Sequence, residues 1–244
     1  MPVTSEGVSI TYEDGPWAKY CTINGVFPHI FEGAGPTEGP TREGWDTEVA
    51  SAFDLIQEIS PDLRRMVDLL VTDLVIVDSG ADGGGSASRL PGTVVMSPGA
   101  DWATLDYAMC LVHEGMHLNL FVADKVNGMF GLTSSALEAD EYRALSAVKI
   151  GQRRPLDKAF HAAVVTVPLM FMQDQQGVTT LVDLYSESLR DACEDLKRQR
   201  PHFNEYGRIL LDELCDFGED INFDLVARAI SSPEYAGYRP NIAA

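Results

Sequence analysis

The sequence predicts an α+β fold that is mainly helical, with a small antiparallel sheet packed against one long helix. Two observations lead to this prediction. Residues 74–77 and 93–96 are β-branched runs bounded by turn residues, which is typical of strands. Residues 101–124 repeat apolar side chains at helical spacing, and most of the chain beyond them follows the same period. Strands that lead into a long amphipathic helix therefore define the fold class.

The N-terminal third contains fewer regular patterns. Residues 1–45 are rich in glycine and proline, so we expect an irregular segment of strands and loops that could act as a lid. Residues 46–59 and 61–71 are expected to form two helices, the second with its proline in the first turn. The glycine-rich segment 78–88 joins the two predicted strands. It is either a flexible loop that orders over a ligand or a simple hairpin connection.

The C-terminal half is expected to be helical. Ser135 and Glu138 have the spacing of a capping box, which predicts the start of a helix. Further helices are expected from Pro155 to about residue 174, over 181–197 and over 206–217. Residues 231–244 are expected to form a loose tail. Because there is no internal repeat or low-complexity linker, the prediction is one domain spanning residues 1–244.

Composition excludes several classes of function. The formal charge of −19 argues against nucleic acid and against an anionic membrane surface, since both require a basic face. The four cysteines are widely spaced, which is typical of reduced thiols in a cytosol. The N-terminus lacks the pattern of a signal peptide, and the longest apolar run, residues 162–172, is too short to span a bilayer. The sequence therefore predicts a soluble, cytoplasmic protein.

The central motif is an H-E-x-x-H sequence formed by His113, Glu114 and His117. On a helix the two histidines lie one turn apart on the same face, so their imidazole nitrogens can bind one metal ion. Glu114 can reach a metal-bound water or orient a ligand. Strands that precede such a helix are also found in metallopeptidases of the zincin type, whose edge strand pairs with an extended peptide.

The third ligand would determine the chemistry, and two alternatives are open. The first is a downstream carboxylate, Glu138 or Glu141, which would give a zinc metallopeptidase. However, the E-x-x-x-D pattern of such peptidases is missing at both positions. The second alternative is His161, on a mainly apolar predicted helix.

The neighbourhood of His161 favours the second alternative. Arg153, Arg154 and Lys158 precede it and form one of few basic clusters in an acidic chain. A metal ion beside a guanidinium suits a small dicarboxylate, which can chelate the ion at one end and bind arginine at the other.

Three stretches of the sequence resemble a known family. They are Pro91–Met96, the motif Leu111–Leu120, and Arg154-Pro155-Leu156 followed by His161. Together they resemble the α-ketoglutarate-dependent HExxH oxygenases, which hydroxylate β-carbons of residues in peptide natural-product precursors. The resemblance covers roughly residues 70–172.

The resemblance implies a non-haem Fe(II) ion held by His113, His117 and His161, with α-ketoglutarate and O2 as co-substrates. It also implies that one of the basic residues, Arg154 first, binds the keto-acid. Glu114 would then be a neighbour of the metal rather than the base of a hydrolysis. The expected substrate is an amino acid or a peptide, free or bound to a leader or carrier. A third interpretation is a module that binds metal or peptide without catalysis.

Overall fold

The computed structural model describes residues 7–230. It is 62% helical and contains a mixed four-stranded sheet and a second sheet of two strands, which confirms the predicted α+β, mainly helical class. The chain divides into two compact units, Met1–Gly128 and Met129–Ala244, and we describe each unit by itself. The single domain expected over residues 1–244 stays a prediction, and the expected tail 231–244 lies outside the described residues.

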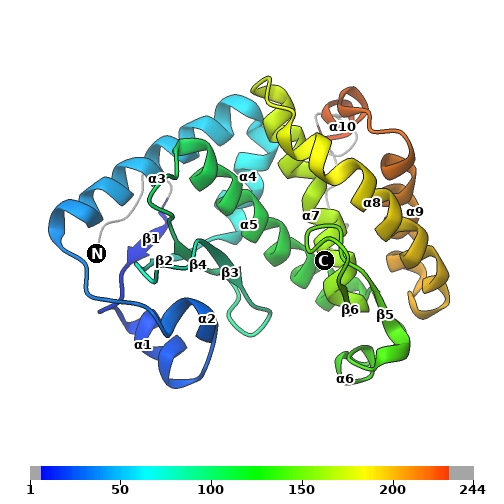
Figure 1. Cartoon of the computed structure of the whole chain (residues 1–244), viewed down its shortest axis with the longest axis horizontal. Coiled ribbons are helices and arrows are strands. Elements are labelled where there is room, and N and C mark those ends of the chain that lie inside the picture. Colours follow the sequence, from blue (N-terminus) through cyan, green and yellow to red (C-terminus); the bar gives the residue numbers. More distant parts are fainter. Residues whose placement is uncertain (1–6, 231–244) are drawn as a thin grey trace, which may run out of the picture. The chain divides into compact units, whose positions relative to one another are not determined.

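The first unit is built around a sheet with strand order β1-β2-β4-β3 (Figure 1). Its members are β1 (Ser9–Thr11), β2 (Asp73–Ile76), β3 (Gly83–Ser86) and β4 (Thr93–Ser97). β1, β2 and β4 are parallel, and only β3 runs antiparallel to its neighbour. The predicted antiparallel sheet is therefore wrong in this detail, and the sheet is mixed.

The reason for the parallel pairing can be followed in the chain. Parallel strands require a long crossover, and the connection from β1 to β2 contains four helices. Strands covered on both faces appear as continuous apolar runs rather than alternating ones. Leu74–Val77 is such a run, and all four of its residues are buried.

Helices cover both faces of this sheet (Figure 1). In chain order they are α1 (Pro16–Ile23), α2 (Pro28–Phe31), α3 (Gly39–Ile59), α4 (Pro61–Leu70) and α5 (Thr104–Asn127). α1 and α2 enclose an apolar cluster with Val75, Val77 and Val95. On the opposite face α5 contacts β3 and β4, while α3 and α4 pack against α5. The helices predicted over 46–59, 61–71 and 101–124 are confirmed.

The N-terminal segment is more regular than predicted. Residues 1–45 were expected to form strands and loops, but the described part contains α1, α2 and the start of α3. The prolines that suggested loops stand at the first positions of these helices, where the missing N–H costs no hydrogen bond.

The second unit is a helical assembly with a small two-stranded sheet. Its elements are α6 (Ser134–Leu137), β5 (Arg143–Leu145), β6 (Arg153–Pro155), α7 (Leu156–Gln175), α8 (Thr180–Arg198), α9 (Glu205–Glu219) and α10 (Phe223–Ile230). α8 packs between α7 and α9. Beside them, the ring of Phe203 lies 5.0 Å from Phe130 and 5.3 Å from Phe160. The helices predicted from Pro155 onward, over 181–197 and over 206–217, are confirmed.

The predicted capping box is wrong. α6 is a single turn, and its N-cap is Thr133 rather than Ser135, with the Thr133 hydroxyl accepting from the Ala136 N–H. Glu138 follows the turn and bonds Lys158 instead of the helix start.

A buried carboxylate attaches the two-stranded sheet to α8. One oxygen of Asp195 accepts the Leu145 N–H and contacts the Arg153 guanidinium, both at 2.9 Å. Its other oxygen accepts from Arg198, also at 2.9 Å. Hydrogen bonds to a buried charge are strong and leave little freedom of placement. Asp195 therefore fixes the start of α7, which directly follows β6.

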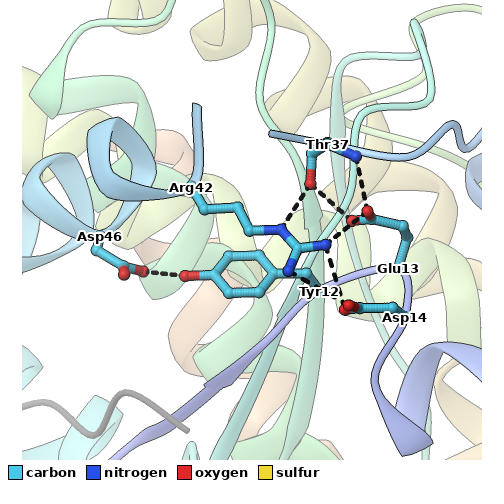
Figure 2. Close-up of polar contacts among 6 residues, drawn as sticks. All are labelled: Tyr12, Glu13, Asp14, Thr37, Arg42 and Asp46. Carbon is cyan, nitrogen blue, oxygen red and sulfur yellow. Dashed lines mark hydrogen bonds and ion pairs between the residues drawn. The ribbon is translucent and has the colours of Figure 1, made fainter. Parts of the chain in front are cut away.

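A polar cluster attaches the start of α3 to the end of β1 (Figure 2). Its members are Tyr12, Glu13, Asp14, Thr37, Arg42 and Asp46. The Arg42 guanidinium lies 4.5 Å from the centre of the Tyr12 ring and 2.7 Å from the Glu13 carboxylate, which also accepts from Thr37. Burial alone would raise the pKa of Glu13, but these hydrogen bonds lower it. Burial and Asp46 raise the pKa of the Tyr12 phenol, which therefore stays protonated and donates to Asp46 at 2.6 Å.

Replacing Arg42 by alanine should destabilise the first unit by about 1–3 kcal/mol, because it removes charge-assisted bonds and a cation–π contact. Urea unfolding measures the change. Arg65→Ala is the matched control, since Arg65 forms an exposed ion pair with Asp62 and its loss should cost no more than about 0.5 kcal/mol. Equal effects of the two substitutions would contradict the role assigned to Arg42.

Candidate functional site

The two histidines of the motif lie together on α5. Their Nε2 atoms are 3.2 Å apart. Two nitrogens that each lie about 2.1 Å from one metal ion are about 3.0 Å apart when the nitrogen–metal–nitrogen angle is a right angle, as in an octahedral site. They are about 3.4 Å apart when that angle is tetrahedral. The distance in this structure therefore fits two ligands of one metal ion. Burial lowers the pKa of His113 to about 4, so its ring is neutral at pH 7, as a ligand must be.

Glu114 is buried beside this pair, with 5% of its surface exposed. Its Oε2 atom accepts a hydrogen bond of 2.6 Å from the Ser86 hydroxyl. Oε1 lies 3.8 Å from the His113 Nε2 atom. Burial raises the pKa of Glu114 to about 7, although hydrogen bonding to Ser86 opposes that rise. The carboxylate thus faces the histidines from a position fixed by β3.

The glycine-rich segment 78–88 forms a strand, β3, rather than a loop that orders over a ligand. The alternative of a simple hairpin connection is also wrong, because the two strands that the segment joins, β2 and β4, are parallel, and it is β3 that pairs antiparallel with β4. Gly84 faces α5, where a Cβ atom would lie 2.6 Å from the Cys110 Sγ atom and 3.2 Å from Glu114 Oε1. Gly85 faces the other side, where a Cβ would lie 2.8 Å from the Phe27 ring. The glycines allow β3 to approach the helices on both faces.

In the second unit, the charge of Arg154 influences His161. His161 lies on α7 with 7% of its surface exposed, and burial together with the charge of Arg154 lowers its pKa to about 4. Arg154 is half-buried on β6, and burial lowers the pKa of its guanidinium, which nevertheless stays charged. Within residues 7–230 the Arg154 side chain forms no hydrogen bond or ion pair.

Three of the other basic and acidic candidates form ion pairs, and the fourth, Glu141, is exposed. Arg153 binds Asp195 and donates to the Arg143 carbonyl. Lys158 forms an ion pair of 2.6 Å with Glu138, and both side chains are exposed. Glu141 is exposed on a short 3-10 turn, residues 140–142. Of the three predicted keto-acid contacts, Arg154 alone combines burial with an unengaged guanidinium in the described part of the chain.

The structure thus brings together His113, Glu114 and His117 in the first unit and His161 with Arg154 in the second. Within residues 7–230 no group of three or more His, Cys, Asp or Glu side chains is arranged to hold a metal ion. The set of three histidines therefore stays a prediction. Sequence reasoning missed Ser86, because a serine after three glycines carries no signal until the strand register is known.

No protein-family model matches the chain, and no curated protein matches it either. In the described part of the chain, no helix has both the length and the apolar character needed to cross a bilayer.

Gly84→Ala should destabilise the first unit by about 1–3 kcal/mol, because the added methyl group meets Cys110 and Glu114. Adding Cys110→Ala should recover part of that loss, since the shortest contact is to its sulfur. Gly44→Ala is the matched control: Gly44 is exposed within α3 with open space around it, and alanine there should stabilise by about 0.5–1 kcal/mol. Urea unfolding of the three variants measures these changes. An unchanged Gly84→Ala protein would refute the close packing.

Proposed function

We propose that this protein is a non-haem Fe(II)- and α-ketoglutarate-dependent oxygenase that hydroxylates an unactivated C–H bond, at a β-carbon, of an amino-acid or peptide substrate. The reaction consumes O2 and converts α-ketoglutarate to succinate and CO2 as the substrate gains a hydroxyl group. The observation that carries the proposal is the burial of His161 on α7, where burial and then the charge of Arg154 lower its pKa to about 4.

The chemistry of these side chains supports the proposal. Three imidazoles, those of His113, His117 and His161, would hold the ion and leave other positions open. When bound, Fe(II) supplies the redox chemistry with O2 that Zn²⁺ lacks. The spacing of the two Nε2 atoms on α5 fits this use.

The remaining residues have roles that follow from their surroundings. The planar Arg154 guanidinium suits the far carboxylate of the keto-acid, which it can bind through two parallel hydrogen bonds. The Glu114 carboxylate, turned toward His113, would orient the molecule that binds next to the ion.

A zinc metallopeptidase is the second candidate. The observation in its favour is the antiparallel edge strand β3 next to the H-E-x-x-H helix, with Glu114 poised beside His113. Its third ligand would be Glu138 or Glu141. Glu138, however, is engaged by Lys158 at the surface, and Glu141 is exposed, so neither carboxylate has the buried setting of His161.

The oxygenase proposal is tested with protein purified without oxygen and loaded with Fe(II). Addition of α-ketoglutarate should produce a visible charge-transfer absorption, and admission of O2 should produce succinate. His161→Ala should lower Fe(II) affinity and succinate formation by at least about 10-fold, because one ligand is lost. His161→Gln serves if the alanine variant does not fold, and His29→Ala, at an exposed position, is the control. Normal iron binding and succinate formation by both His161 variants would exclude His161.

Arg154→Gln should raise the KM for α-ketoglutarate by about 10-fold or more, since a hydrogen bond between charged groups contributes about 1.5–3 kcal/mol. Lys158→Gln should leave this KM within about twofold, because its ammonium group is bound to Glu138. The reverse pattern, measured by succinate formation over a range of keto-acid concentrations, would assign the keto-acid to Lys158.

Glu114→Gln separates the two candidate functions. In a peptidase this change abolishes turnover while zinc stays bound, because the general base is lost. In the proposed oxygenase, succinate formation should persist at a reduced rate. Peptide hydrolysis by the zinc-loaded protein that disappears in the Glu114→Gln variant would decide for the peptidase.

A further inference from the structure

We infer that Ser86 is a positioning residue of the metal site: its hydroxyl holds the Glu114 carboxylate so that Oε1 faces the His113 ring. The inference deepens the proposed function and rests on the metal site that this function includes. It assigns a role in that site to β3, a strand outside the H-E-x-x-H motif.

The bond from the Ser86 hydroxyl defines the orientation of the carboxylate. The hydroxyl donates to Oε2 at 2.6 Å, a short distance that is typical of a hydrogen bond to a carboxylate. With Oε2 held in this way, Oε1 is the oxygen that lies 3.8 Å from the His113 Nε2 atom.

The backbone of β3 reinforces this arrangement. Gly84 brings the strand so close that a Cβ would lie 3.1 Å from Glu114 Cγ and 3.2 Å from its Oε1 atom. Antiparallel pairing with β4 sets the register of the strand, with Gly84 opposite Met96 and Ser86 opposite Val94. Residues two apart in a strand point to the same face, so Gly84 and Ser86 both face α5. The strand therefore donates a hydrogen bond to Glu114 at Ser86, and at Gly84 it leaves space for the Glu114 side chain.

The surroundings of the carboxylate make the Ser86 bond the one that orients it. Within residues 7–230, the side-chain hydrogen bond recorded at the Glu114 carboxylate comes from Ser86, whereas His113 lies farther away at 3.8 Å. Cys110, one turn before Glu114 on α5, is buried. Ser86 is thus the residue that sets where Glu114 points, and its hydroxyl can be removed without changing the motif.

The test uses the full-length protein and Co²⁺ as a spectroscopic probe. Ser86→Ala should weaken Co²⁺ binding by about 10-fold and shift the visible absorption of the cobalt complex, as is typical when an outer contact of a metal site is lost. Ser86→Thr keeps a hydroxyl and should restore both readouts to within about twofold of the original protein. A variant that was merely less stable would change the unfolding midpoint and leave the cobalt spectrum as it was.

Ser97→Ala is the matched control. Ser97 lies buried on the neighbouring strand β4, and its hydroxyl contacts Ser79 rather than the motif. Its removal should leave the affinity for Co²⁺ and the cobalt spectrum unchanged.

A double-mutant cycle decides whether Ser86 acts through Glu114. In a Glu114→Ala background, Ser86→Ala should have no further effect on Co²⁺ affinity, because the group that it positions is gone. A full 10-fold loss in that background overturns the inference, and so does an unchanged affinity and spectrum of the single variant. If Ser86→Ala does not fold, Ser86→Cys, with a weaker donor, should give an intermediate affinity; an unaltered affinity again overturns the inference.

The failures of the two proposals are distinguishable. Co²⁺ binding that depends on Ser86, in a protein that forms no succinate, refutes the oxygenase and leaves the inference intact. Succinate formation with cobalt binding that ignores Ser86 does the opposite. A protein that binds no Co²⁺ refutes the metal site and with it both proposals.

Discussion

The packing of β3 against α5 is the constraint on which the candidate site depends. A strand normally keeps its distance from a helix because side chains fill the space between them. Here Gly84 has no side chain to insert, so the backbone of β3 comes within contact distance of Cys110 and Glu114. That close approach lets the Ser86 hydroxyl donate to the Glu114 carboxylate. Because a buried carboxylate without hydrogen-bond donors destabilises a fold, this bond reduces the free-energy cost of burying Glu114. The rest of the first unit supports this contact. α3 and α4 pack against α5, and α1 and α2 cover the other face of the sheet.

Much of the fold follows from local patterns in the sequence. The helical period of residues 101–124 and the continuous apolar runs of the two central strands predict their elements within a few residues. The direction of the strands could not be predicted in the same way, because parallel and antiparallel pairing depend on how the chain crosses between strands. Prolines also misled: near residues 16 and 28 they mark helix starts, although glycine and proline together suggested loops.

The residues of the candidate site also differ in whether the sequence alone can reveal them. His113, Glu114 and His117 are recognisable because their spacing is a property of one helix. Ser86 is distant in the sequence and becomes visible only through the register of β3 against β4. In the second unit, the sequence predicted a basic cluster of Arg153, Arg154 and Lys158 with Arg154 as the first candidate, and in the structure the contacts of the three side chains differ. Arg153 and Lys158 are engaged by Asp195 and Glu138, and that difference depends on contacts that no local pattern encodes.

The buried Asp195 carboxylate has a broader implication for interpreting genetic data on this chain. Asp195 accepts hydrogen bonds from residues of β5, β6 and α8. The position of β6, which carries Arg154, therefore depends on α8, a helix that begins well after His161 in the sequence. A screen that scores activity alone would therefore place Asp195 among the residues of the site, although it would touch no ligand. Pairing such a screen with a measure of protein abundance would separate the scaffold from the chemistry.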